Sequence, residues 1–231
     1  MSYPRIVKAE ILKNFPLCKD IYALELSLSQ ELKPLPGQFM FLKIFQGFGE
    51  SICRPFVFNS FNEKTVIIYK IVGEGTLALS KLKPGEILSA IAPLGKRPFS
   101  SNQENILIAS GVKLAAIAGL QSPELFFIEE NKGEREILQY FQLKATILKT
   151  KEELFEAIKP KAGKRFSLSI QSELALELKS NFNIAGEIFM QARVACGWGA
   201  CYGCAIETKS GYKRLCIDGP VFNLEDVYRV N

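Results

Sequence analysis

Short runs of partly alternating apolar and polar residues dominate the first hundred residues of the chain. These runs are rich in β-branched and aromatic residues, and prolines and glycines separate them, so they read as short strands joined by turns. Several strands at this spacing predict a small closed antiparallel barrel with one short helix at Thr76–Leu82. The clearest runs are Arg5–Leu12, Ile21–Leu28, Gln38–Ile44 and Val66–Val72.

The pattern changes after about residue 100, where strand and helix signals alternate. Asn105–Ser110 reads as a buried strand that runs into a turn at Gly111 and then into an apolar helix over Leu114–Leu120. Such alternation is typical of a small parallel α/β sheet. The further strands are expected at Leu125–Glu129, Ala145–Leu148 and Phe166–Ile170, and the further helices at Glu134–Tyr140 and Lys151–Ile158.

The fold class expected from these patterns is mixed β and α/β. We expect an antiparallel β-barrel domain over residues 1–100, a small parallel α/β domain of nucleotide-binding type over 101–188, and a cysteine-rich segment over 189–231.

The cysteine-rich segment has the form C-x4-C-x2-C…C, with Cys196, Cys201, Cys204 and Cys216 at the four positions. This is the ligand spacing of a plant-type [2Fe–2S] cluster. Four thiolates are what two irons bridged by two sulfides require, two on each iron. Three of the six residues between the first three cysteines are glycines, which let the backbone curl around a cluster and direct N–H groups at its sulfurs. The four cysteines are therefore predicted to be metal ligands.

Structural zinc is the main alternative, because four cysteines also form a tetrahedral zinc site. Zinc ribbons usually pair one C-x2-C with another, and the x4 spacing lacks such a partner. The absence of His excludes Rieske-type ligation and Cys/His zinc sites. A disulfide framework is disfavoured, since the chain starts without an apolar signal segment. Cys18 and Cys53 are interpreted as free thiols.

Composition and charge narrow the range of possible partners and reactions. The formal charge of +5 is mild and scattered, so we expect no nucleic-acid partner. The longest apolar stretch, Ile106–Leu120, contains Lys113 and is shorter than the about 20 residues that a membrane helix needs, so no membrane partner is expected. These features indicate a cytoplasmic protein. The lack of His favours a redox carrier over a hydrolase, because near-neutral proton transfer usually uses His.

Several segments occur in an order that resembles the electron-transfer subunit of dihydroorotate dehydrogenase, within the ferredoxin reductase superfamily. Asp218–Phe222, after the fourth cysteine, is the most specific of them. The resemblance implies an FAD-binding barrel of ferredoxin-reductase type, an α/β domain that would hold NAD, and one [2Fe–2S] cluster in the C-terminal segment. The segments are Arg54–Val57, Ile68–Thr76, Ala92–Lys96, the cysteine loop and Tyr212–Phe222.

The same resemblance implies a function in pyrimidine biosynthesis. Electrons would pass from the FMN of a catalytic partner subunit through the cluster to FAD, and on to NAD or another acceptor. The two subunits would form a heterotetramer, and dihydroorotate would be oxidised on the partner, so this chain carries no catalytic residue of its own.

The resemblance also assigns residues to FAD. Arg54 matches an arginine that can hold the pyrophosphate through forked hydrogen bonds, and Pro55 and Phe56 shape the wall beside the flavin ring. Val57 stands where the family usually has Ser, so a hydroxyl contact to the ring is lost. The structural alternative is that Arg54 is a surface ion-pair residue. The remaining matches are the strand residues Tyr69, Lys70 and Ile71, and the phosphate turn Gly75 and Thr76, where a helix begins.

The segments that match the nicotinamide site depart from the family. Ala109–Lys113 replaces a Gly-Gly-Gly-x-Gly turn and keeps one glycine, and Ser169–Leu174 replaces Cys-Gly-Pro-x-Pro-Met. NAD binding is therefore left open. Trp198 and Tyr202, in the cysteine loop, could cover the cluster, contact the partner or simply pack.

Two other functions compete with this interpretation. The chain could be the FAD/[2Fe–2S] reductase subunit of a different oxidoreductase, or a zinc-stapled, non-catalytic binding protein. The joint presence of Arg54-Pro55 and Gly75-Thr76 upstream of the cysteine loop speaks against the zinc protein.

Overall fold

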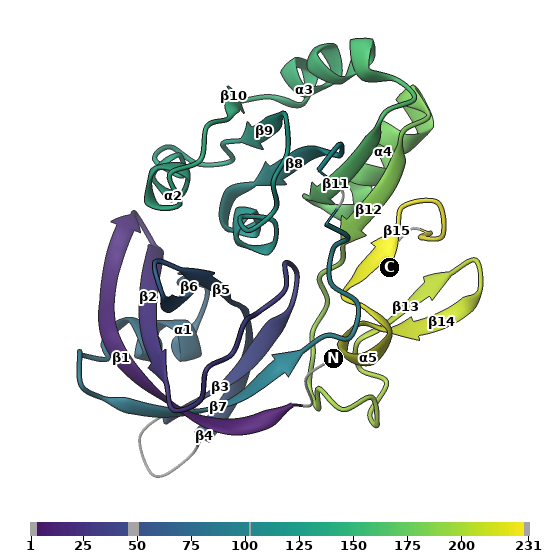
Figure 1. Cartoon of the computed structure of the whole chain (residues 1–231). Helices are drawn as coiled ribbons and strands as arrows, with labels where there is room; N and C mark the ends of the chain where they lie inside the picture. Colours follow the sequence, from purple (N-terminus) through teal and green to yellow (C-terminus); the bar gives the residue numbers. More distant parts are fainter. Residues whose placement is uncertain (1–3, 46–50, 102, 229–231) are drawn as a thin grey trace.

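A curled antiparallel sheet of seven strands forms the N-terminal part of the computed structural model, which describes residues 4–45, 51–101 and 103–228 (Figure 1). The strand order is β4-β3-β7-β1-β2-β6-β5, with the edge strands β4 and β5 at its two ends. The antiparallel barrel predicted for this part takes the form of a half-barrel. Its elements are β1 (Arg5–Cys18), β2 (Ile21–Leu28), β3 (Phe39–Phe45), β4 (Ser51–Val57), β5 (Asn59–Phe61), β6 (Lys64–Lys70), α1 (Glu74–Ser80) and β7 (Ile87–Leu94).

The alternation along β2 gives the half-barrel two buried faces. Leu24 and Leu26 pack inside the curl with residues of β1, β3 and β7, whereas Ile21 and Ala23 join a cluster that includes residues of the α/β domain. Successive side chains of a strand point to opposite faces, so one strand can serve both cores. The half-barrel and the α/β domain are thus joined by an apolar contact, and Figure 1 shows β2 and β6 below the second sheet.

Among the described residues, six strands form this second sheet, in the order β10-β9-β8-β11-β12-β15. The first five are parallel, as the alternation predicts, and β15 is antiparallel to β12. The order reverses at β8, between β9 and β11, which is where doubly wound sheets usually bind ligands. The elements are β8 (Ile106–Ser110), the 3₁₀ helix η2 (Gly111–Ala116), β9 (Leu125–Ile128), α2 (Glu136–Tyr140), β10 (Thr146–Leu148), α3 (Lys151–Ile158), η3 (Lys159–Lys161), β11 (Arg165–Ser169), α4 (Ser172–Phe182) and β12 (Ala185–Phe189).

The C-terminal segment connects both sheets. It contains the hairpin of β13 (Ala205–Thr208) and β14 (Gly211–Arg214), the short helix α5 (Leu215–Asp218) and β15 (Val221–Asn223), which adds an edge strand to the parallel sheet. Arg97, after the half-barrel, donates its N–H to Gly219 and its guanidinium to Asn223 Oδ1 over 2.6 Å. The cysteine loop is therefore held against the end of the half-barrel.

The stretch after β8 is where the structure overturns a prediction. The apolar helix expected over Leu114–Leu120 is wrong: a 3₁₀ helix covers Gly111–Ala116 and the chain then turns. Asn59 of β5 donates to the carbonyl of Ala115 over 2.8 Å. In an α-helix the Ala115 carbonyl would accept the N–H of Gly119. The hydrogen bond to the half-barrel takes its place, so tertiary contact overrides the local preference for helix. In the part of the chain that the structure describes, no helix has the length and hydropathy to cross a membrane.

Candidate functional site

A cavity of about 620 Å³ lies where the half-barrel faces the α/β domain and the C-terminal segment. Cofactor sites typically span roughly 300–1,000 Å³, so the volume is suitable for a large ligand. Ile71, one of the nine residues that the resemblance assigns to FAD, lies outside it and donates its N–H to the carbonyl of Asp20. The other eight line the cavity: Arg54, Pro55, Phe56, Val57, Tyr69, Lys70, Gly75 and Thr76.

Arg54 lies against the first turn of α1. A Cβ atom on Gly75 would come within 3.2 Å of Arg54 Nε, so glycine permits this close approach. Lys70 also lines the cavity, as does Lys113, whose charge is paired with Glu130 at 3.5 Å, and Glu74 is the one acidic side chain among the lining residues. The wall therefore carries an excess of positive charge, which suits a ligand that contains phosphate.

Thr76 shapes the turn that leads into α1. Its hydroxyl accepts hydrogen bonds from the N–H groups of Val72, over 2.9 Å, and Gly73, and donates to the carbonyl of Gly73. The hydroxyl is therefore used within the turn, and its role at the cavity is to hold the backbone of this turn in place.

Tyr69 forms a rigid part of the wall. Its ring packs edge-on against Phe56 and stacks on Tyr22, and its hydroxyl donates to Asn14 Oδ1 over 2.9 Å. Asn14 in turn donates to the carbonyls of Leu79 and Leu82, at the end of α1. Burial raises the pKa of the Tyr69 hydroxyl well above its usual value, so the side chain stays neutral.

The far side of the cavity is built by residues that the sequence did not indicate. Met190, Gln191 and Val194 follow β12, and Leu215 and Pro220 belong to the segment around the fourth cysteine. Leu215 is the neighbour of Cys216, so the cavity reaches the cysteine segment. The position of Leu215 next to the predicted ligand Cys216 was the one signal in the sequence that could have placed it in the cavity wall.

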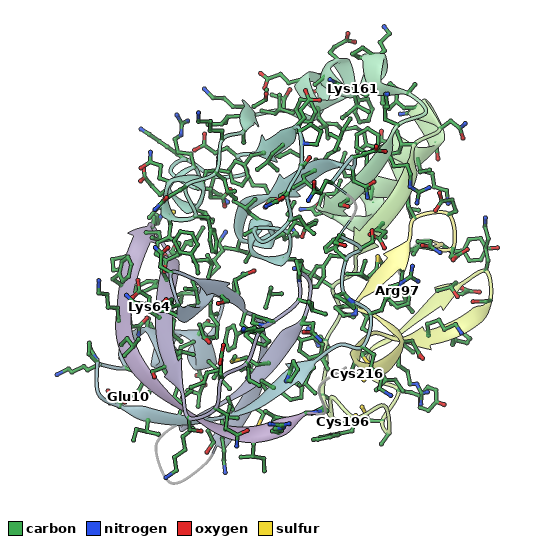
Figure 2. All side chains as sticks on the ribbon, viewed as in Figure 1. Glu10, Lys64, Arg97, Lys161, Cys196 and Cys216 are labelled. Atoms are coloured by element: carbon green, nitrogen blue, oxygen red, sulfur yellow. The ribbon has the colours of Figure 1, made fainter. Side chains whose placement is uncertain are left out.

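The four cysteines lie in two pairs. Cys204 Sγ and Cys216 Sγ are 3.4 Å apart and both side chains are buried, whereas Cys196 and Cys201 hydrogen-bond to each other closer to the surface. Figure 2 shows Cys196 and Cys216 where the C-terminal segment meets the end of the half-barrel. Among the residues that the structure describes, no three His, Cys, Asp or Glu side chains gather around one point as a metal-binding group. The four thiols therefore form one buried pair and one pair closer to the surface.

Backbone N–H groups point at these sulfurs. Trp198 N–H donates to Cys196 Sγ and Gly203 N–H to Cys201 Sγ, each over 3.4 Å. The N–H groups of Cys201 and Trp198 lower the pKa of Cys196 to about 6. Burial, followed by the neighbouring Cys204, raises the pKa of Cys216. The loop therefore stabilises thiolate at its exposed end, while the buried pair needs a positive partner to ionise.

Two glycines permit the loop to take this shape. Gly197 and Gly199 both have positive φ, of 74° and 80°. A side chain on Gly197 would overlap the ring of Phe41, and one on Gly199 would overlap Ile217. Both the backbone conformation and the close packing therefore require glycine.

Arg214 holds the loop from the other side. Its guanidinium donates to the carbonyl of Gly199 over 2.7 Å and lies 4.7 Å from the centre of the Tyr202 ring. Its own N–H donates to Asp218. Tyr202 and Trp198 nevertheless remain 59% and 56% exposed, so neither is simply packed in a core.

Known proteins share this combination of fold and segment. A sequence profile for the iron-sulfur cluster binding domain of dihydroorotate dehydrogenase B matches residues 191–228. The chain is 32% identical to the dihydroorotate dehydrogenase B (NAD(+)) electron transfer subunit homolog of Aquifex aeolicus (strain VF5), over 96% of this chain and 98% of the relative. The chain belongs to the family of dihydroorotate dehydrogenase B electron transfer subunits.

Other comparisons agree with this family. The electron transfer subunit of Caldanaerobacter subterraneus subsp. tengcongensis is 28% identical, again over 96% of this chain and 98% of the relative. A solved structure of an NADH-dependent reduced ferredoxin-NADP oxidoreductase, described for flavin-based electron bifurcation, superposes with a TM-score of 0.77 at 19% identity, over 95% of this chain and 89% of that one. The predicted resemblance and the ferredoxin-reductase type of fold are confirmed.

The two segments that depart from this family lie side by side. Ala109–Lys113 ends β8 and opens η2, and Ser169–Leu174 ends β11 and opens α4. The hydroxyl of Ser169 donates to the carbonyl of Lys113 over 2.7 Å. The structure thus brings both departures to the single crevice where the strand order reverses.

Proposed function

We propose that this chain is the electron-transfer subunit of a two-subunit dihydroorotate dehydrogenase in pyrimidine biosynthesis. It passes electrons from the FMN of a catalytic partner, through a [2Fe–2S] cluster and FAD, to NAD or another acceptor. The observation that carries the proposal is the shared wall between cavity and cysteine segment, because Leu215 lines the cavity and adjoins Cys216.

Cys196, Cys201, Cys204 and Cys216 are proposed as the cluster ligands. A [2Fe–2S] cluster takes two thiolates on each iron, which agrees with two pairs of sulfurs and with the N–H groups directed at them. Zinc ribbons usually pair one C-x2-C with another, and the x4 spacing between Cys196 and Cys201 lacks such a partner. The arrangement therefore favours the cluster.

FAD is proposed to occupy the cavity of about 620 Å³. Arg54, Lys70 and the first turn of α1 would hold its phosphates, and Pro55, Phe56 and Tyr69 would form the wall beside the ring, with Val57 contributing only apolar contact. FAD supplies the conversion between one-electron and two-electron transfer, which a cluster alone does not provide. The residues of this chain bind and orient these groups and exclude water from them.

The exposed face of the cysteine loop is proposed to contact the partner. Trp198, Tyr202 and Tyr212 are 56%, 59% and 73% exposed around the loop, and aromatic residues are enriched where proteins associate. The less buried pair, Cys196 and Cys201, would face the FMN subunit, while the buried pair would lie on the side of the cavity, where Leu215 beside Cys216 is a lining residue. We further propose a heterotetramer, a cytoplasmic location, and functional domains at residues 1–100, 101–188 and 189–231.

Co-purification tests this function. The chain is co-expressed with the FMN-containing dihydroorotate dehydrogenase subunit encoded in the same genome, and the mass of the eluted complex is measured. The proposal predicts a stable complex with two copies of each subunit. A chain that elutes with another dehydrogenase would be a reductase subunit of a different oxidoreductase, and a colourless zinc protein that elutes alone would contradict the proposal.

A further inference from the structure

The crevice at the carboxyl ends of β8, β9 and β11 is occupied by the chain's own side chains. Ligands of doubly wound sheets bind in this crevice, with a dinucleotide's pyrophosphate over the turn after the first strand. Here that turn is Ser110–Lys113, and several side chains at and around it already have partners within the chain.

A buried carboxylate lies over the turn. Glu134 is 2% exposed, and its oxygens lie 3.2 and 3.3 Å from the position of a Cβ on Gly111. Asn131 fixes the carboxylate through its N–H, over 3.0 Å, and its side-chain amide, over 2.8 Å. A pyrophosphate would have to approach the negative charge of the Glu134 carboxylate. This carboxylate is held in place and buried, so solvent and salt screen the repulsion only weakly.

The lysine of the turn is also engaged. Lys113 Nζ donates to Ser110 Oγ and pairs with Glu130 at 3.5 Å. The positive charge of Lys113 is therefore partly neutralised before any phosphate binds.

The carboxylate of Glu129, which follows β9, is engaged as well. It accepts hydrogen bonds from Nε and Nη2 of Arg135 and from the N–H of Gly133. An acidic residue in this region often binds a ribose hydroxyl, and here it is occupied.

The gap between β8 and β11 is closed. Ser169 is fully buried and its hydroxyl bonds to the carbonyl of Lys113, which joins the ends of the two strands. The cavity beside Glu173 measures about 160 Å³ and is separated from the larger cavity by shared lining residues, Lys113 among them. This is below the roughly 300 Å³ at which cofactor sites begin.

We infer that Glu134, the Lys113–Glu130 ion pair and the Ser169–Lys113 hydrogen bond exclude nicotinamide dinucleotides from this crevice. The relatives' names carry NAD(+), whereas this chain delivers its electrons to an acceptor that does not bind at the carboxyl edge of its parallel sheet. The inference rests on the proposed function, since it concerns the acceptor of the same electron route.

Direct binding of NADH is the test, because the fluorescence of NADH reports binding whether or not flavin is present. The purified holoprotein is titrated with NADH and then, anaerobically, with dithionite. The inference predicts no saturable NADH binding and no bleaching by NADH, with full bleaching by dithionite. Saturable binding, or flavin bleached by NADH, would overturn it. Missing flavin and iron–sulfur bands would instead refute the proposed function and leave the NADH titration to decide the inference.

Variants test the named residues. Glu134→Gln removes the negative charge over the turn and keeps one oxygen that can accept a hydrogen bond from Asn131. Glu130→Gln, at a more exposed position, removes the ion pair with Lys113. Each is expected to show saturable NADH binding at concentrations where the unaltered protein shows none, a gain in affinity of at least about tenfold, or about 1.4 kcal/mol. Glu136→Gln, on α2 but outside the crevice contacts, is the matched control and should not bind. If both crevice variants behave like the control, these residues do not exclude the dinucleotide.

Discussion

Cys204 Sγ lies 3.4 Å from Cys216 Sγ, although the two residues are twelve positions apart in the chain. The hairpin β13–β14 separates them in sequence and returns the chain to the same place, where Leu215 N–H donates to the carbonyl of Cys204. The buried half of the proposed cluster site is thus formed by the fold of the C-terminal segment, next to the cavity proposed for FAD.

Loss of one buried cysteine should remove the cluster. Cys204→Ser is expected to lower bound iron to near zero and abolish the iron–sulfur bands, because the serine hydroxyl holds its proton far more strongly than a thiol and is a poor replacement for a thiolate ligand. FAD should remain, since Cys204 does not line the cavity. Metal analysis and the visible spectrum measure both. Cys53→Ser, at an exposed thiol, is the control and should keep full iron; a full cluster in Cys204→Ser would refute the ligand assignment.

Arg54 should be needed for FAD. Arg54→Ala removes a charged hydrogen-bond donor from the cavity, which corresponds to roughly 1.5–3 kcal/mol, or about tenfold to a hundredfold weaker FAD binding. The measurement is a titration of the flavin-free protein with FAD. Arg5→Ala is the matched control, because Arg5 bonds Gln30 on the exposed surface. Equal affinities in the two variants would make Arg54 a surface ion-pair residue.

The glycines of the cysteine loop permit a test of packing. Gly199→Ala combines a strained positive φ with overlap on Ile217, whereas Gly211→Ala has a positive φ of 90° and no atom within 4 Å of the new Cβ. Both share a backbone cost of about 1 kcal/mol. We expect the cluster bands of Gly199→Ala to decay in air much faster than those of Gly211→Ala. Equal decay rates would show that packing on Ile217 has no role.

Glu129 should make stability depend on pH. Hydrogen bonds from Arg135, followed by the N–H of Gly133, lower the pKa of the Glu129 carboxyl to about 2. The unfolded value is about 4.3, so the stabilisation is complete above that pH and is lost as the pH falls from about 5 to 2. In urea unfolding, the advantage of the unaltered protein over Glu129→Gln should stay constant between about pH 7 and about pH 5 and shrink between about pH 5 and about pH 2. A constant difference would contradict this.

Local signals were sufficient for several elements. The strand predicted at Ile21–Leu28 and the helix at Lys151–Ile158 match β2 and α3 to the residue. α3 begins where the hydroxyl of Thr150 accepts the N–H of Glu153, an ordinary helix cap. The helix α4 was missed, although Ala175 and Leu178, both buried, follow helical spacing. Ser169–Leu174 had been compared only with a family motif.

The candidate site was predictable only in part. Cysteine spacing identified the four thiols, because that motif is local and specific. Met190, Gln191 and Leu215 were not indicated, since their place in the cavity wall arises when the C-terminal segment folds back across both sheets. The closed crevice was hinted at by the missing glycines, but Glu134 and its contact with Gly111 depend on how α2 and its preceding turn pack.

We expect the cluster and the FAD of this chain to receive electrons from dihydroorotate through the partner subunit. The most direct measurement is the anaerobic visible spectrum of the purified two-subunit complex before and after addition of dihydroorotate. The account predicts flavin and iron–sulfur bands that both bleach, with two irons, two sulfides and one FAD in each copy of this chain. A complex whose iron–sulfur bands are absent, or stay unchanged while the partner's FMN is reduced, would contradict it.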